Sequence, residues 1–466
     1  MNHSVQIAFG VYMGMAVTSY IVLVLLSLRA DRKYRQTFSY RNLLLWGLRK
    51  NQPSVTVLAP ARNEEPIILP SVKALLGLGY PLVVVDDGST DKTFDLLQTE
   101  YALQETSGAT PETLPHKPIL SVWHSAVEPR LTVVKKVWSG GSKGDGNNAG
   151  LEVVKTTYVF VTDIDSVVEP DAIIKMVARQ QETKAIAIGC PLRPLNGCST
   201  DRNGFRVQLP KNYWAFSQVI EYLRTFQLRQ GWASMGMLNN ISGAAGLFQT
   251  NALHEIGGYR TDTTAEDLAS TFGFHQHKMP IAFEPSVNVY TQVPETWKSL
   301  ASQRRRWARG LFDILVDSRK ILTQGTRHTL LSLWLWAFEW IEPFIEVTGL
   351  CWIAERVYHH RMPFFWGWVI LVGGMSITSL LSVICIVQQE RLYRRLSTKA
   401  ILMLIVFSWV EIFPFKIPLA LMWRIYGTFA YLSGNKSWEP LPRQQFKEEK
   451  ACDTLSQVAA VQSAAK

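Results

Sequence analysis

Short runs of apolar, β-branched residues alternate with helical patterns through the middle of the chain. Residues 54–59 and 82–86 are two such runs, and between them apolar residues recur at helical spacing up to a stop signal at Gly79. The pattern repeats and ends in the run at 158–163. Strands that alternate with helices predict a mostly parallel sheet with helices on both faces, in which ligands bind at the carboxyl ends of the strands.

A long apolar segment precedes this region. Residues 5–28 are almost free of charge, and a helix needs about 20 apolar residues to span a bilayer. Lys and Arg residues follow the segment and none precede it, which predicts a retained anchor and not a cleaved signal peptide. By the positive-inside rule, the N-terminus then faces outward and the middle domain lies in the cytoplasm.

The chain changes character again after the middle domain. Residues 297–322 place basic side chains on one helical face and Trp and Leu on the other, which suits a helix in the membrane interface. Two further spans are predicted near 329–354 and 363–387. A third apolar stretch, at 400–432, is interrupted by two prolines, and it either crosses once or enters and returns.

These patterns predict an integral, multi-pass protein of the plasma or inner membrane, with an α/β domain and transmembrane helices at both ends. Its expected parts are an anchor at 1–30, a cytoplasmic α/β domain at 52–295, interfacial amphipathic helices at 296–325, a C-terminal transmembrane region at 329–432 and a tail at 433–466. Glu339, Glu342 and Glu346 recur at helical spacing in the first of the later spans. They either line a polar pathway for a sugar or mark a helix that rides at the interface.

Charge and cysteine content narrow the function classes. The chain of 466 residues carries a formal net charge of +10, but many of its basic residues flank apolar runs, as membrane topology and anionic lipid head groups favour. No soluble stretch interleaves basic and aromatic residues, so no nucleic-acid partner is expected. The five cysteines form no CxxC pair, which argues against a zinc site or a disulfide framework.

An acidic pair follows the last of the predicted strands. Asp163 and Asp165 flank Ile164, and strand alternation predicts that both carboxylates point to the same side. Such oxygens suit a hard cation, Mg²⁺ or Mn²⁺, with phosphate oxygens completing its shell. A DxD pattern alone is more often a solvated loop or a helix cap, and the strand ahead of it is what favours a site.

Two other candidates would contact a nucleotide diphosphate. Asp86 and Asp87 stand at the end of a predicted strand, where they either face a nucleotide or belong to a turn at Gly88. Lys143 lies in a glycine-rich loop ahead of a helix, where it would meet a diphosphate with help from backbone N–H groups. The loop does not match the Walker pattern, so the sequence gives little support to the hypothesis that the chain is an ATPase.

The remaining candidates lie later in the chain. Asp267 follows Glu266 at a predicted helix start, where it is either a general base or a favourable partner of the helix dipole. Gln303, Arg306 and Trp307 belong to a basic string on the amphipathic helix. That string is either a membrane-surface helix or part of a site. In such a site, Arg306 would neutralise phosphate charge and the Trp307 ring would stack on a sugar ring.

In their order along the chain, these motifs resemble those of the processive family 2 membrane glycosyltransferases. DDGSTD, DID, AED and QRRRW resemble the D, DxD, [TE]D and QxxRW series of the cellulose, hyaluronan and chitin-like synthases. The resemblance runs from about Val55 to Arg309, and the string around Trp438 is similar to the tail of bacterial poly-N-acetylglucosamine synthases. It implies a GT-A nucleotide-diphospho-sugar transferase fold, inversion at the anomeric carbon and a metal-dependent UDP-sugar site.

The resemblance also implies roles on the donor side. Asp86 and Asp87 would hold the uridine end of the donor, and Lys143 would hold its diphosphate. Asp163 and Asp165 would flank the donor and the metal, with Asp165 as the metal ligand.

On the acceptor side, the resemblance implies that Asp267 deprotonates the acceptor hydroxyl. Gln303, Arg306 and Trp307 would shape the acceptor entrance near the diphosphate. The segment at 242–248 is similar to the loop that lies beside the acceptor.

The predicted function is therefore polymerisation of sugar from a UDP-sugar into a membrane-translocated polysaccharide. The chain departs from the family pattern in three ways: the third motif reads AED where TED is usual, only one N-terminal span is evident, and no cyclic-dinucleotide domain follows. The last departure makes UDP-N-acetylglucosamine a better donor candidate than a cellulose precursor. The expected partners are the donor, the growing glycan, the lipid bilayer and auxiliary membrane or export subunits. Two alternatives remain open: an enzyme that adds a single sugar to a lipid, and a transporter or receptor with an inactive domain.

Overall fold

The computed structural model describes residues 3–51, 53–106, 112–201, 204–319, 325–410 and 417–433. The chain forms two compact units, which are described separately below. Among the described residues, the sheet unit comprises 34–210 and 238–293, and the helical unit comprises 3–33, 211–237 and 294–433.

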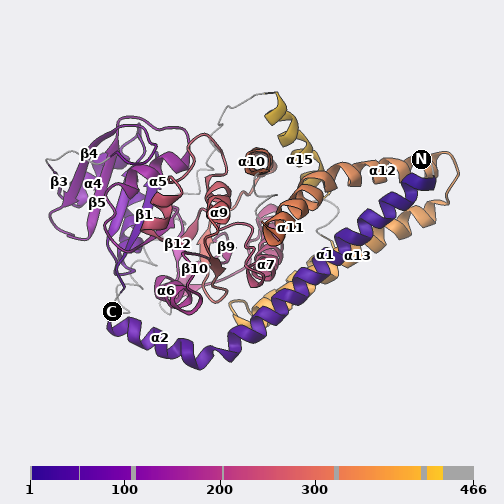
Figure 1. Cartoon of the computed structure of the whole chain (residues 1–466), viewed down its shortest axis with the longest axis horizontal. Helices are drawn as coiled ribbons and strands as arrows, with labels where there is room; N and C mark the ends of the chain where they lie inside the picture. Colours follow the sequence, from indigo (N-terminus) through magenta and orange to yellow (C-terminus); the bar gives the residue numbers. More distant parts are fainter. Residues whose placement is uncertain are drawn as a thin grey trace. The chain divides into compact units, whose positions relative to one another are not determined.

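A nine-stranded sheet forms the core of the sheet unit (Figure 1), in the order β13-β8-β12-β6-β1-β2-β5-β4-β3. Two small sheets, β10-β11 and β7-β14-β9, accompany it. The strands are β1 (Val55–Ala61), β2 (Leu82–Asp86), β3 (Leu103–Glu105), β4 (Ile119–Ser125), β5 (Leu131–Lys136), β6 (Tyr158–Thr162), β7 (Val167–Val168), β8 (Ala187–Gly189), β9 (Leu192–Pro194), β10 (Ser199–Asp201), β11 (Gly204–Arg206), β12 (Ala245–Gln249), β13 (Ile281–Phe283) and β14 (Val289–Thr291).

The sheet is mixed, so the prediction of a mostly parallel sheet is confirmed only in part. The central strands β6, β1, β2 and β5 are parallel neighbours, as the sequence pattern predicts. However, β12 runs antiparallel to both β6 and β8, and β4 runs antiparallel to both β3 and β5. The β12 strand enters the sheet from far along the chain, and local apolar runs carry no information about such a long-range insertion.

Helices flank the central strands of this sheet. They are α2 (Phe38–Lys50), α3 (Ile68–Leu76), α4 (Thr93–Glu100), α5 (Lys143–Leu151), α6 (Ala172–Thr183), α8 (Thr250–Glu255) and α9 (Glu266–Gln276). The chain moves from β1 to β2 through α3, and it returns from β5 past β1 to β6 through α5. Because parallel crossovers are right-handed, this reversal places α3 and α5 on opposite faces of the sheet and makes β1 the switch point where ligands bind.

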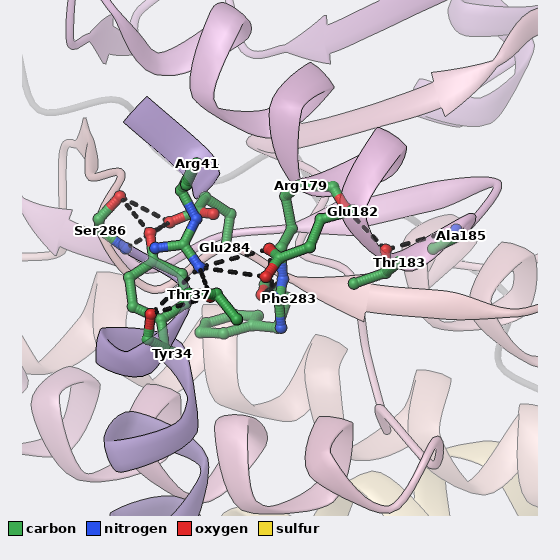
Figure 2. Close-up of polar contacts among 10 residues, drawn as sticks. All are labelled: Tyr34, Thr37, Arg41, Arg179, Glu182, Thr183, Ala185, Phe283, Glu284 and Ser286. Atoms are coloured by element: carbon green, nitrogen blue, oxygen red, sulfur yellow. Dashed lines mark hydrogen bonds and ion pairs between the residues drawn. The ribbon is translucent and has the colours of Figure 1, made fainter. Parts of the chain in front are cut away.

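A polar cluster holds the end of the N-terminal helix and the start of α2 against α6 and β13 (Figure 2). The Arg41 side chain donates to the Tyr34 carbonyl at 3.3 Å and forms an ion pair with Glu182, also at 3.3 Å. The Tyr34 hydroxyl donates to Glu284, a fully buried carboxylate that also accepts from the Ser286 hydroxyl at 2.6 Å. These contacts anchor α2, a helix that the sequence analysis did not predict.

The helical unit is built from long apolar helices. They are α1 (His3–Gln36), whose last turn belongs to the sheet unit, α7 (Tyr213–Ser234), α10 (Trp297–Asp317), α11 (Thr326–Trp334), the π-helical segment η2 (Leu335–Ile341), α12 (Glu342–Tyr358), α13 (Phe364–Leu392), α14 (Thr398–Phe407) and α15 (Ile417–Leu432). Figure 1 shows α1 beside α13. The side-chain amide of Gln388 on α13 donates to Asp31 of α1 at 2.8 Å. The backbones of α10 and α15 approach closely at Gly427, where a Cβ atom would lie 2.7 Å from that of Ala308.

Two helices of the described chain are long and apolar enough to cross a membrane, Ile7–Gln36 and Phe364–Leu392. They coincide with the spans predicted at 5–28 and near 363–387. The predicted span near 329–354 is not among them, because that stretch is divided among α11, η2 and α12. The predicted stretch at 400–432 contains α14 and α15, and residues 411–416 and the tail from 434 lie outside the described residues.

Candidate active site

Acidic side chains lie at one edge of the central sheet. Asp86 is the last residue of β2, and Asp163 follows the last residue of β6. In the sheet, β1 separates these two parallel strands, so the carboxyl ends of all three strands meet at the same edge. The acidic residues predicted from separate motifs therefore share the switch point of the sheet.

Asp86 is almost fully buried, at 1% exposure. Its carboxylate accepts a hydrogen bond from the Ser89 backbone N–H at 3.0 Å. Burial raises the pKa of Asp86, and the bonds from Ser89 only partly oppose this effect. Burial makes ionisation of this carboxylate unfavourable. A carboxylate that is kept at the end of a strand despite this free-energy cost is a candidate for ligand recognition.

Next to Asp86, a buried lysine joins two carboxylates. The Lys136 ammonium forms ion pairs with Asp87 and Asp145, and the Ser139 hydroxyl donates to Asp87 at 2.6 Å. Burial lowers the pKa of Lys136 despite the charge of Asp87 beside it. The cluster holds the Asp87 carboxylate in one orientation at the strand end.

The glycine-rich loop fits tightly between its neighbours. Gly88 has φ +67°, and a Cβ atom there would lie 2.6 Å from the Ser139 backbone nitrogen. At Gly144, a Cβ atom would lie 2.4 Å from the Arg260 carbonyl oxygen. Only glycine permits these approaches, and they bring the start of α5 against the acidic edge.

Lys143, the first residue of α5, lies on the β6 side of this edge. Its ammonium forms an ion pair with Asp163 and donates to the Gly243 carbonyl at 2.7 Å. Burial alone would lower the pKa of Lys143, but Asp163, Glu266 and Asp267 outweigh it, so the pKa lies above its ordinary value. Lys143 is therefore a fixed positive charge beside Asp163.

Asp267 lies on the other side of the same backbone segment. One oxygen of its carboxylate accepts from the Gly243 N–H at 3.0 Å and from the Asn240 amide at 3.4 Å. The other oxygen accepts from the Leu268 N–H at 2.8 Å. Gly243 therefore links Lys143, through its carbonyl, to Asp267, through its N–H, so residues from three separate motifs meet around one peptide segment.

The Asp163–Asp165 segment differs in geometry from its prediction. It is a turn and not an extended strand, because the Ser166 N–H bonds back to the Asp163 carbonyl at 3.1 Å. Ile164 is buried, whereas both aspartates are partly exposed. Strand alternation therefore does not apply to this segment, and the shared direction of the two carboxylates stays a prediction.

This carboxylate pair fits a divalent cation that also binds phosphate. In the described chain, no group of three or more His, Cys, Asp or Glu side chains is placed to hold a metal ion. Mg²⁺ is usually held by one or two carboxylates together with substrate phosphates, not by a full protein cage. Asp163 and Asp165 supply that number of carboxylates at an edge that also carries the Lys143 charge.

Gln303, Arg306 and Trp307 lie on α10, in the helical unit. Gln303 is buried, whereas Trp307 is 41% exposed. Arg304 of the same string donates to Glu221 of α7 at 2.7 Å and lies over the Trp307 ring at 4.2 Å. Part of the basic string therefore holds α10 against α7, and the acceptor role of the other residues stays a prediction.

Sequence reasoning missed Lys136, Asp145 and Asn240. The strand pattern predicts that one of the two adjacent lysines of β5 points inward. It does not predict which carboxylate forms an ion pair with that lysine. Asp145 reads as a solvated residue of a glycine-rich loop. Only the approach of α5 to β2 reveals it as the partner of Lys136.

The chain has recognisable relatives among characterised proteins. Residues 121–310 match the family described as "Glycosyltransferase like family 2". The poly-beta-1,6-N-acetyl-D-glucosamine synthase of Staphylococcus epidermidis is 24% identical over 317 residues, which cover 67% of this chain and 66% of that protein. The beta-monoglucosyldiacylglycerol synthase of Nostoc sp. is 25% identical over 352 residues, 73% of this chain and 67% of that protein. The chain thus spans 66% of the staphylococcal synthase, just under two thirds.

Among solved structures, a mannosyltransferase from Pyrobaculum calidifontis in complex with GDP-Man and Mn²⁺ is similar with a TM-score of 0.49 and 17% sequence identity. The similarity covers 84% of this chain and 98% of that one. The family match and the sequence relatives agree with the mixed α/β sheet and its acidic edge. Residues 121–310 of the chain are therefore similar to the family 2 glycosyltransferases, and the sequence relatives extend that similarity over about two thirds of the chain.

Proposed function

We propose that the chain transfers sugar from a UDP-sugar, with UDP-N-acetylglucosamine as the first choice, to a growing glycan at a membrane. The observation that carries this proposal is the Gly243 segment, whose carbonyl contacts Lys143 and whose N–H contacts Asp267. A cation suited to the diphosphate and a carboxylate suited to deprotonate an acceptor are thereby held on two sides of one peptide segment. Such an arrangement places both partners of a transfer reaction at one edge.

On the donor side, Asp86 and Asp87 hold the uridine end, and Lys143 neutralises the diphosphate. The buried Lys136 forms an ion pair with Asp87 and so orients the carboxylate toward the donor. Asp163 and Asp165 would hold Mg²⁺ or Mn²⁺, with Asp165 as the main ligand. The cation would supply positive charge to the leaving diphosphate.

On the acceptor side, Asp267 acts as the general base. The hydroxyl oxygen of the acceptor forms a bond to the anomeric carbon while the bond from that carbon to the diphosphate oxygen breaks. The hydroxyl proton passes to Asp267, and the electron pair of the broken bond leaves with UDP. The hydrogen bonds from the Gly243 and Leu268 N–H groups fix the orientation of the Asp267 carboxylate. A single displacement of this kind inverts the anomeric configuration.

Gln303, Arg306 and Trp307 form the acceptor entrance in this proposal. An exposed indole offers a flat apolar face to a sugar ring. The α1 and α13 helices hold the enzyme in the plasma or inner membrane, the sheet unit lies in the cytoplasm, and the product passes to auxiliary membrane or export subunits. The two candidate spans support the membrane placement.

Polymerisation and single transfer differ in their acceptor, and the relatives include one synthase named for each outcome. We favour polymerisation because the string at 303–307 accompanies the acidic motifs. The test is incorporation of radiolabel by the purified chain in lipid, with Mg²⁺ or Mn²⁺, over a panel of UDP-sugars. High-molecular-mass product from one donor supports the proposal and identifies the sugar. Label confined to short, lipid-extractable product replaces polymerisation with single transfer to a lipid.

A further inference from the structure

An apolar pocket of about 770 Å³ lies in the helical unit, outside all of the residues assigned above. It is lined by the start of α7, by one face of α14 and by the turn that follows α14. Its lining residues are Lys211, Tyr213, Phe216, Lys399, Leu402, Met403, Val406, Phe407 and Val410. The volume falls within the range of about 300–1,000 Å³ that is usual for ligand sites.

The apolar wall of the pocket is a stripe along α14. Leu402, Met403 and Val406 recur at helical spacing, and they are 58%, 49% and 69% exposed. Phe407 packs edge-on against Tyr213 and Phe216, with ring centroids 5.6 and 4.6 Å apart. An exposed apolar stripe over an aromatic floor matches a hydrocarbon chain and not a polar ligand.

The charged end of the pocket is formed by two lysines and two helix starts. Lys211 directly precedes the cap of α7, and Lys399 lies in the first turn of α14. In the described part of the chain, neither lysine forms an ion pair or a hydrogen bond. The positive ends of the two helix dipoles add to the two ammonium charges. This end of the pocket is therefore suited to an anionic group.

The length of α14 indicates where such a ligand comes from. The helix has 10 residues, whereas a helix needs about 20 to span a bilayer. In an embedded chain, a short apolar helix with a lysine in its first turn lies with that turn at head-group level and its apolar stripe among the acyl chains. The lysines and the apolar wall then match the two parts of a phospholipid.

We propose that this pocket binds an anionic phospholipid, with an acyl chain along the α14 stripe and the head-group phosphate at Lys211 and Lys399. The proposal rests on the membrane placement given under the proposed function, but not on the transfer reaction. It assigns to α14 a lipid-binding role that is separate from catalysis.

The experiment uses the full chain in nanodiscs of phosphatidylcholine that contain a photoactivatable phosphatidylglycerol or, for comparison, a photoactivatable phosphatidylcholine. Mass spectrometry then locates the cross-linked peptides. We expect phosphatidylglycerol to label peptides that contain the α14 stripe and the start of α7, in preference to phosphatidylcholine. The double variant Lys211→Ala/Lys399→Ala should reduce this labelling at least about tenfold, because each lysine near an anionic lipid contributes electrostatic attraction.

Two further variants keep the test specific. Arg32→Ala/Lys33→Ala removes the same charge from exposed positions on α1 and should leave the labelling of the pocket unchanged. Val406→Trp fills the pocket from an exposed position and should block labelling while both lysines remain.

Three results would overturn the proposal: equal labelling by both lipids, absence of label from the pocket peptides, or cross-links there to a second copy of the chain. A chain that stays soluble without detergent would remove the membrane placement itself. An embedded, active enzyme without lipid in the pocket would remove only this inference.

Discussion

Each unit of the molecule buries a carboxylate cluster, and the two clusters are satisfied in different ways. In the sheet unit, Asp87 and Asp145 share the charge of Lys136. In the helical unit, the fully buried Asp31 accepts from the amides of Gln227, Gln230 and Gln388, at 3.0, 2.7 and 2.8 Å. The first cluster pairs opposite charges, whereas three neutral amides donate to the carboxylate of the second.

The difference separates a binding edge from a packing device. At the binding edge, Lys143 and Asp163 are partly exposed, so a diphosphate and a cation can reach them and exchange partners with them. Asp31 is fully buried, and it joins α1 to α7 and α13 through the buried amide of Gln227 and the partly buried amide of Gln388. The accessible pair fits the proposed donor site, whereas the buried carboxylate fits a role in packing α1 against its neighbours.

The largest effect is expected for Asp267→Asn. The amide keeps the shape and one acceptor oxygen but cannot take a proton, so transfer should fall by about 100-fold or more. UDP binding should stay nearly intact, because the proposed role of Asp267 is toward the acceptor and not toward the donor. Radiolabel incorporation and UDP affinity measured on the same preparation check the two halves.

Asp262→Asn is the matched control for this variant. Asp262 lies in the preceding loop, where it pairs with Arg260 at 2.8 Å and is 66% exposed, so its neutralisation should leave transfer unchanged. Full activity in Asp267→Asn would remove Asp267 as the base.

The next effect tests the charge-paired cluster. Lys136→Met leaves Asp87 and Asp145 buried without their cation, which should cost about 3–5 kcal/mol of unfolding free energy. Lys136→Arg keeps the charge and should recover part of that loss. Thermal unfolding followed by intrinsic fluorescence compares the variants, and equal stability of Lys136→Met and wild type would show that the pairing is not needed.

Asp31 should respond to shape and not to charge. Asp31→Ala leaves buried amide donors without a partner, at about 1–3 kcal/mol for each. In Asp31→Asn the new amide can donate to the side-chain oxygens of Gln227 and Gln230, which are buried without a hydrogen-bond partner among the described residues. The Asn variant should therefore be close to wild type in thermal unfolding. A loss as large as that of Asp31→Ala would mean that the negative charge is needed there.

The smallest effect is a gain in stability. Burial raises the pKa of Asp86, so its ionised form is disfavoured in the folded state, and this penalty grows as the pH rises through the folded-state pKa. Asp86→Asn should thus raise the apparent melting temperature slightly at pH 7, and the gain should vanish as the pH falls below the ordinary range of an aspartate. UDP binding should weaken in the same variant. Lower stability of the variant at pH 7 would contradict the assigned cost of ionisation.

Local patterns predict much of the sheet edge. Asp86 and Asp163 follow β-branched runs, and such runs become buried parallel strands whatever the rest of the chain does. The turn at Asp163–Asp165 is not predictable from alternation, because it depends on the Ser166 bond to the Asp163 carbonyl. The role of Gly243 depends on β12, which enters the sheet between β6 and β8 from far along the chain.

Charge pairs are the least predictable part of the molecule. Glu339 was singled out for its position in an apolar stretch, and the structure pairs it with Arg424 of α15 at 2.9 Å. The partner lies 85 residues further along the chain, and no spacing rule reaches that far. Lys136 and Asp145 are only nine residues apart, but they lie on a strand and a helix, and the packing of these two elements brings the side chains together.

The most direct test of the central claim is UDP affinity measured with and without Mn²⁺. In the wild type, Mn²⁺ should tighten UDP binding by about tenfold or more, because a divalent cation bridges the carboxylates and the diphosphate. In Asp163→Asn/Asp165→Asn this gain should disappear, while the weaker metal-free binding remains. UDP binding that ignores Mn²⁺, or a gain that survives in the double variant, would contradict a donor site at this edge of the sheet.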